Sequence, residues 1–167
     1  MGSVIPKSKP PLGALISAVC AKDEICVRKL LDDNADINEQ YGWNLMTPLH
    51  WSTQLNLTKI AILLLNRDAD IDMRSSIGST PLHIAAGFAS TVVVKLLLNK
   101  GALINEIDLN GDTPLHYAAY NNNIDNADVL IRAGANVNME NYFGEIPILH
   151  TALSQLSNIS STIKNNI

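Results

Sequence analysis

The tetrapeptide Thr-Pro-Leu-His occurs three times, beginning at Thr47, Thr80 and Thr113, and each copy follows the previous one by 33 residues. A constant period of roughly 20 to 50 residues is typical of an array of similar structural units. Such a chain has no single central core, because each unit buries its apolar surface only against the units beside it. This period constrains the possible folds more than any other feature of the sequence.

The clearest unit covers residues 78–105. Thr80 is a favoured residue immediately before a helix, and Pro81 suits the first helical position, where its missing N–H costs nothing. Residues 87–90 interrupt this short helix, and a second helix begins near Val92 and ends at Gly101, which favours the left-handed backbone that closes a helix. Two such short helices cannot bury their apolar faces alone, so the unit requires copies on either side.

The ends of the predicted second helices repeat with the same step, except that the first interval is 34 residues and its extra residue falls in the connector 39–46. These ends are Ala35–Asn38, Ala69–Asp72, Ala102–Asn105 and Ala135–Asn138. We expect a repeat domain at 12–153, with units at about 12–38, 39–72, 73–105, 106–138 and 139–153. An N-terminal tail at 1–11 precedes it and a C-terminal capping segment at 154–167 follows it. The fifth unit is degenerate, since its His150 comes one residue late.

The motif and its period resemble the ankyrin-repeat family, whose signature is a period of 33 residues with Thr-Pro-Leu-His-x-Ala. The resemblance extends over roughly residues 12–153 and implies an all-α solenoid of stacked helix–turn–helix units joined by hairpin fingers. In this family the motif histidine typically bonds to nearby backbone and threonine hydroxyl groups. The resemblance therefore implies structural roles for Thr47, Pro48, His50, Thr80, Pro81, His83, Thr113, Pro114 and His116.

Composition excludes several classes of protein. The 167 residues are 47% hydrophobic and 17% charged, which argues against disorder. The formal net charge of −4 disfavours a nucleic-acid partner. No apolar run reaches the roughly 18 residues of a membrane helix, so we expect no membrane insertion. We interpret Cys20 and Cys26 as small core residues of a protein in a reducing compartment, rather than as a disulfide.

The regular histidines invite a metal-site interpretation, which stacking geometry rejects. Neighbouring helices lie about 8–10 Å apart, whereas all zinc ligands lie about 2 Å from one ion. No Ser/His/Asp set, glycine-rich phosphate loop or paired-carboxylate site stands out in the sequence. We therefore expect no metal, no cofactor and no enzymatic activity.

The aromatic residues and the acidic residues share one side of the expected array. Family architecture places the fingers and the first helix of each unit on a concave side, and all eight aromatic residues fall there. Acidic residues also gather in the fingers, with Arg74 as the only base. Aromatic side chains commonly anchor interfaces. The predicted partner-binding residues are Trp43, Arg74, Ile77, Phe88, Leu109, Asp112, Tyr120, Tyr142, Phe143 and Glu145.

Two alternatives remain open for these residues. Trp51, Ile84 and Tyr117 follow the motif histidines and serve either the binding surface or the packing between units. Several exposed aromatics could also fold back onto neighbouring fingers and stiffen the edge of the array. The side-chain positions in the folded protein distinguish these cases.

The sequence favours a non-enzymatic, monomeric protein–protein interaction module of the cytoplasm or nucleus, acting as an adaptor or inhibitor. One alternative is a regulatory or targeting domain of a larger enzyme or channel. Another is a pathogen or viral effector similar to inhibitors of Rel-type factors, which would act in the host cytosol. The expected partner is a protein that carries apolar and basic groups.

Overall fold

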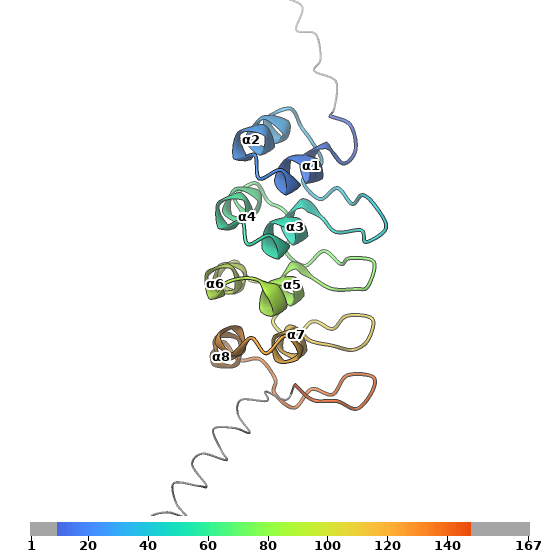
Figure 1. Ribbon diagram of the computed structural model, residues 1–167, viewed down its shortest axis with the longest axis vertical. Helices are drawn as coiled ribbons and strands as arrows, with labels where there is room; N and C mark the ends of the chain where they lie inside the picture. Colours follow the sequence, from blue (N-terminus) through green and yellow to red (C-terminus); the bar gives the residue numbers. More distant parts are fainter. Residues whose placement is uncertain (1–9, 148–167) are drawn as a thin grey trace, which may run out of the picture.

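The structure is a computed structural model in which residues 10–147 are described. Over this range the chain forms eight helices in four stacked pairs and no strand (Figure 1). This arrangement confirms the predicted all-α solenoid. The helices are α1 (Ala14–Cys20), α2 (Glu24–Asp32), α3 (Pro48–Gln54), α4 (Thr58–Leu65), α5 (Pro81–Phe88), α6 (Thr91–Asn99), α7 (Pro114–Tyr120) and α8 (Ile124–Arg132).

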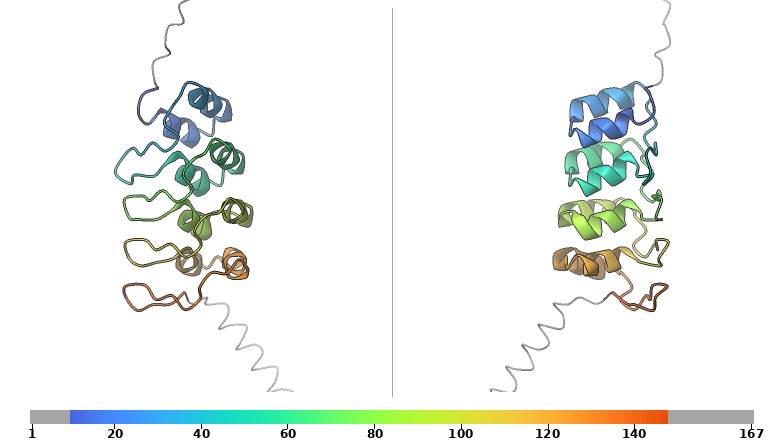
Figure 2. Two further views of the ribbon diagram at one scale, coloured as in Figure 1. Left: turned by 180° about the vertical axis from the view of Figure 1, so that it is seen from behind. Right: turned by 45° about the vertical axis from the view of Figure 1, so that its right-hand side comes forward.

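The array has three layers. The first helices α1, α3, α5 and α7 form one column, and the second helices α2, α4, α6 and α8 form another (Figure 1). The fingers that connect successive pairs project beyond the first helices, on the side away from the second helices (Figure 2). We call the fingers and the first-helix column together the finger side.

The sequence motif explains where the first helices begin. In α3 and α7 the hydroxyl oxygens of Thr47 and Thr113 accept hydrogen bonds from the backbone N–H groups of His50 and His116. A proline occupies the first helical position of α3, α5 and α7, where no backbone donor is needed. These residues fix the starts of three helices locally, before any contact between units is made.

Left-handed residues close the second helices at the predicted positions. Asn34 and Asp68 have φ angles of 62°, and Gly101 and Gly134 have φ angles of 93° and 98°. Glycine, asparagine and aspartate tolerate this conformation better than other residues. The predicted helix-ending role of Gly101 is confirmed, and Asn34, Asp68 and Gly134 take the same role in their own units.

The core is a continuous ladder of leucine and valine side chains between the two helix columns. Each unit contributes one fully buried leucine from its first helix, and the second helices add further buried residues. These side chains are Leu15, Leu49, Leu82 and Leu115 from the first helices, and Val27, Leu64, Leu97 and Leu130 from the second helices. The core therefore depends on stacking, as the repeat period predicts.

Cys26 packs against the core as predicted, but Cys20 does not. Cys20 is exposed and Cys26 is only half-buried. Both lie in the terminal pair α1–α2, which packs against a described neighbour on one side only, and Cys20 is the last residue of α1. The interpretation of Cys20 as a core residue is wrong.

Helix α5 ends differently from α3 and α7. Asn56 and Asn122 follow α3 and α7 with φ angles of 55° and 51°, but the equivalent Ala89 is extended, with φ −94° and ψ 172°. Three carbonyl groups at the end of α5 are instead bonded by the side-chain amide of Asn126 from α8. This contact joins the third unit to the fourth.

Three expectations fall outside the described residues. They are residues 1–9 of the N-terminal tail predicted at 1–11, the shifted motif at His150, and the capping segment 154–167. The finger at 139–147 is described, and it stacks on the preceding finger.

Candidate partner-binding surface

The three motif histidines connect successive units. The imidazole Nδ1 atoms of His50 and His83 lie 2.8 and 2.9 Å from the hydroxyl oxygens of Thr47 and Thr80 in their own unit. Their Nε2 atoms lie 2.9 Å from the backbone carbonyl oxygens of Ser79 and Asp112 in the next finger. The third histidine repeats this arrangement, with Nδ1 2.8 Å from the hydroxyl of its own threonine and Nε2 3.0 Å from the carbonyl oxygen of Glu145.

Burial keeps the imidazoles of His50 and His83 neutral at physiological pH. His50, His83 and His116 are 0% exposed. Desolvation lowers the pKa of His50 from 6.5 to about 4, and it also lowers the pKa of His83. A neutral imidazole can both accept and donate one hydrogen bond, which matches the threonine on one side and the carbonyl on the other.

The fingers are held together at their tips by backbone hydrogen bonds. Leu109 N–H donates to the carbonyl of Ile77 at 3.0 Å, and Tyr142 N–H donates to the carbonyl of Asn110 at 2.9 Å. Gly78 and Gly111 make this approach possible, because a Cβ at either position would lie 2.9 or 2.8 Å from the following finger's backbone nitrogen.

Fingers are numbered by the unit that they begin, so the second finger lies at 39–46. It reaches the same stacking with a different pair of residues. Leu45 takes the glycine position with a φ angle of 48°, and the small Ser76 of the next finger donates its N–H to the carbonyl of Asn44 at 2.9 Å. A bulky residue in this backbone region is strained. Every described pair of adjacent fingers from two to five is therefore in direct contact at its tips.

Large apolar side chains project from every one of these fingers. Their exposed fractions range from 52% to 89%. We call this set the fingertip row, and its members are Trp43, Ile77, Leu109, Tyr142 and Phe143. Side chains of this size are seldom left so exposed in adjacent positions unless a partner covers them.

The two aromatic residues at the first-helix ends behave differently from each other. Phe88, the last residue of α5, is 52% exposed. The ring of Tyr120 is 56% exposed, but its hydroxyl lies 3.0 Å from both the Asp112 and the Glu145 carboxylates. Burial and these carboxylates raise the pKa of Tyr120. Tyr120 therefore combines an accessible ring with a hydroxyl that joins α7 to two fingers.

The predicted charged contact residues occupy three different environments. The Arg74 guanidinium donates to the Glu106 carboxylate and, at 2.7 Å, to the carbonyl of Ile107, so that it links two fingers. Glu145 is exposed, whereas Asp112 is only 7% exposed. The Asp112 carboxylate therefore lies inside the finger instead of on the surface.

Fewer acidic residues of the fingers are exposed than the sequence predicts. Glu39 and Asp108 are each 3% exposed. The Glu39 carboxylate accepts the backbone N–H groups of Gly13 and Ile16 at 2.9 Å, at the start of α1. These acids satisfy buried backbone donors, so their charge is not presented to a partner.

Comparison with known proteins supports the assignment that the fold suggests. The family described as "Ankyrin repeats (3 copies)" matches residues 68–141, and "Ankyrin repeat" matches residues 44–76. The chain belongs to the ankyrin-repeat family. Ankyrin-repeat domains are generally protein-interaction modules.

One curated relative of this ankyrin array is the bovine (Bos taurus) "Ankyrin repeat and SOCS box protein 5". The two sequences are 36% identical over 76 residues, which cover 45% of this chain and 22% of the relative. The aligned part of the chain thus corresponds to about a fifth of that protein.

The residues that follow the motif histidines pack within the ankyrin array. Ile84 is 6% exposed, and Trp51 and Tyr117 lie against the hydrophobic core. Tyr117 meets the ring of His83 edge-on at a centroid distance of 5.2 Å, and its hydroxyl donates to Asp108 at 2.9 Å. Of the two roles left open by the sequence, these residues serve packing between units.

Asn141 is a functional candidate that the sequence analysis missed. Its side-chain amide lies within hydrogen-bonding distance of Asp112, Tyr120 and Glu145. Its carbonyl oxygen accepts the N–H groups of residues 143 and 145, just as Asp108 accepts those of residues 110 and 112. This correspondence across one 33-residue period was the signal available in the sequence.

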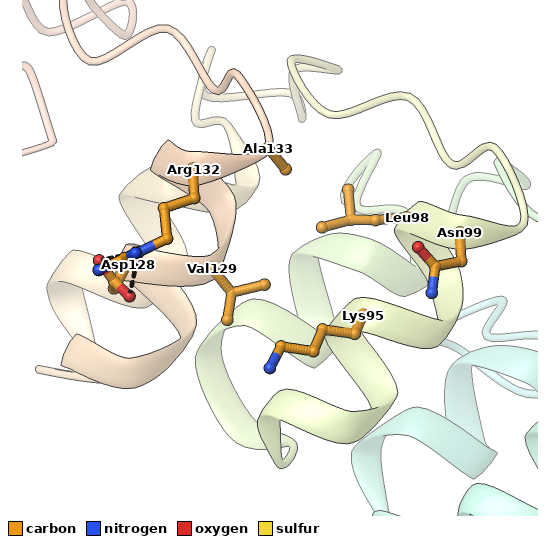
Figure 3. Close-up of a pocket in the computed structure, with 7 residues that line it drawn as sticks. All are labelled: Lys95, Leu98, Asn99, Asp128, Val129, Arg132 and Ala133. Carbon is orange, nitrogen blue, oxygen red and sulfur yellow. Dashed lines mark hydrogen bonds and ion pairs between the residues drawn. The ribbon is translucent and has the colours of Figure 1, made fainter.

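A cavity of about 460 Å³ lies on the other side of the ankyrin array, between α6 and α8 (Figure 3). Its lining contains none of the predicted partner-binding residues. The lining residues are Lys95, Leu98, Asn99, Asp128, Val129, Arg132 and Ala133.

Among residues 10–147 no group of three histidine, cysteine or acidic residues is arranged to hold a metal ion. The same residues include no helix long and apolar enough to cross a membrane.

Proposed function

We propose that this chain is a non-enzymatic interaction module that binds a partner protein on its finger side and acts as an adaptor or inhibitor. The observation that carries this proposal is the fingertip row, in which large apolar side chains project from four successive fingers. Hydrogen bonds between the tips hold these side chains in a fixed arrangement, which lowers the entropic cost of binding. Phe88 and the ring of Tyr120 extend the apolar surface onto the first helices.

A second candidate is an ankyrin module that serves a larger protein. The name of the bovine relative combines ankyrin repeats with a SOCS box in one protein, and this chain matches only part of it. The same finger side would then recruit a partner to another domain. Action in the cytoplasm or nucleus as a monomer is part of both proposals, and sedimentation of the purified chain tests the oligomeric state.

The test compares substitutions of exposed apolar residues on the two sides of the array. In the first set, Trp43, Leu109 and Phe143 are replaced by serine. In the control, serine replaces Ile25 and Val92, which are 81% and 58% exposed on the second-helix column. Both variants are expected to remain folded, since surface substitutions usually change stability by only about 0.5 kcal/mol each.

The variants are then used as baits with quantitative mass spectrometry of the captured proteins. The proposal predicts specific partners that the control retains and the fingertip variant loses by at least about tenfold, as expected for interface anchors. Equal capture by the two folded variants would show that the partner does not bind the fingertip row.

A further inference from the structure

We propose that the fourth and fifth fingers dock a partner segment that carries an arginine. Its guanidinium would bind the exposed Glu145 carboxylate, close to the ring of Tyr120, while adjacent apolar residues of the segment cover Leu109, Tyr142 and Phe143. This inference rests on the proposed function and names the chemistry of the partner at one end of the fingertip row.

The first support is a shortage of hydrogen-bond donors around Glu145. The Tyr120 hydroxyl has one hydrogen but lies 3.0 Å from both Asp112 Oδ1 and Glu145 Oε2. The Asn141 amide has two hydrogens but lies 2.8 Å from Asp112 Oδ1, 3.0 Å from Tyr120 Oη and 3.1 Å from Glu145 Oε2. Three hydrogens are thus shared among five short contacts, and two contacts are left without one.

The second support is uncompensated negative charge. Hydrogen bonds from Asn141 and Tyr120 lower the pKa of Glu145, so its carboxylate is ionised at neutral pH. No described ion pair includes Asp112 or Glu145. All four arginines of the chain already pair with other carboxylates, in the pairs Arg28–Glu24, Arg67–Asp32, Arg74–Glu106 and Arg132–Asp128. Within residues 10–147 no arginine therefore neutralises this cluster, and no lysine forms an ion pair with it.

The third support is the apolar surface beside the charge. Tyr142 and Phe143 belong to the same finger as Glu145 and are 70% and 73% exposed, and Tyr120 is 56% exposed. A guanidinium donates several hydrogen bonds in one plane and stacks on aromatic rings, whereas an ammonium group is compact and strongly hydrated. Arginine is thus the cationic residue that complements both the donor shortage and the exposed rings.

The probe is Nα-acetyl-arginine N-methylamide, titrated into the ¹⁵N-labelled full chain and followed by NMR. The matched control probe is the citrulline analogue, which has nearly the same shape but no charge. The proposal predicts saturable shifts of the amide signals of Tyr120 and residues 141–145, with at least about fivefold weaker binding of the citrulline probe. Absence of these shifts, or equal binding of the two probes, would overturn the proposal.

Two variants separate a local site from general electrostatics. Glu145→Gln should weaken arginine binding at least about threefold, the effect of losing one partly exposed ion pair. Glu140→Gln removes an exposed acid from the same finger outside the cluster and should change the affinity less than about twofold. Equal weakening by both variants would refute a specific site.

A third variant tests the site independently, in case Glu145→Gln folds poorly. Tyr120→Phe removes one of the cluster's three hydrogens but leaves both carboxylates, so it should bind the arginine probe as well as the native chain or more tightly. Clear weakening by Tyr120→Phe would contradict the donor-shortage argument.

The outcome is separable from that of the proposed function. If the arginine probe fails while the fingertip substitutions still abolish partner capture, the arginine site is rejected and the docking function stands. If the probe binds as predicted while partner capture is insensitive to the fingertips, the cluster binds arginine and the fingertip row is not the docking surface.

Discussion

Replacing Asn126 by valine is expected to destabilise the array, although apolar residues occupy the equivalent positions one and two periods earlier. Those positions hold Val93 and Ile60, which are buried. From the sequence, Asn126 marks the fourth unit as the weakest helix pair, and valine would count as a repair. The structure predicts the opposite, because the Asn126 side chain bonds the end of α5 in the preceding unit.

The magnitude follows from the hydrogen bonds that are lost. The Asn126 amide nitrogen lies 3.1, 3.0 and 2.9 Å from the carbonyl oxygens of Ala85, Ala86 and Ala89. Its two hydrogens can make two good bonds, each worth about 1 kcal/mol, and a buried carbonyl left unpaired costs about 1–3 kcal/mol. Valine recovers about 1 kcal/mol, since it adds apolar contact and removes the unpaired Asn126 Oδ1. The expected net loss is about 1–3 kcal/mol.

The measurement is equilibrium unfolding in urea, followed by circular dichroism. The double variant Ala89→Asn with Asn126→Val provides the control, because asparagine at residue 89 can adopt the left-handed turn that follows α3 and α7. It should be more stable than Asn126→Val alone. A valine variant as stable as the native chain would refute the argument that the amide is needed at the end of α5.

Three further predictions follow from the burial or exposure of particular side chains. Because burial lowers the pKa of His50 from 6.5 to about 4, its contribution to stability is complete above about pH 6.5 and falls as the pH is lowered towards 4. At pH 5 the free energy of unfolding should be lower by about 2 kcal/mol, which urea unfolding can measure. The His50→Gln variant should lose less stability over the same pH range. His83→Ala should cost about 2–4 kcal/mol through the loss of two buried hydrogen bonds and the ring's packing, with no effect of EDTA on the native melting temperature; a fall on EDTA treatment would indicate a metal. Trp43→Ala should change the melting temperature by less than about 3 °C, because the side chain is 89% exposed, and a larger fall would show that it supports the finger.

The local sequence determined most of the fold. Thr-Pro at the helix starts and Asn34, Asp68, Gly101 and Gly134 at the helix ends act within a few residues of themselves, so their roles follow from backbone preferences alone. The 33-residue period then requires that the pairs stack, because none can bury its apolar face alone. Trp43, Phe88, Tyr142 and Phe143 are exposed, and their role in partner binding stays a prediction.

The tertiary structure decided what the polar residues do. Glu39, Asp108 and Asp112 are acidic finger residues in the sequence, but folding buries them against backbone donors and hydroxyl groups. The Glu39 carboxylate meets backbone donors 23 and 26 residues away, and Asn141 reaches Asp112 across 29 residues. A local sequence pattern does not specify such contacts.

Asn126 and the Glu145 cluster show the same limit. A polar residue in an apolar position of a helix is a defect when judged from its own unit, and it becomes a link only when the adjacent unit presents unpaired carbonyls. Likewise, the donor shortage around Glu145 exists only once Tyr120 from α7 meets Asn141 and Glu145 of the following finger. Backbone preferences and hydrophobic periodicity act within one unit, so they can be recognised in the sequence. Hydrogen bonds between units depend on the relative placement of two units, so only the assembled array defines them.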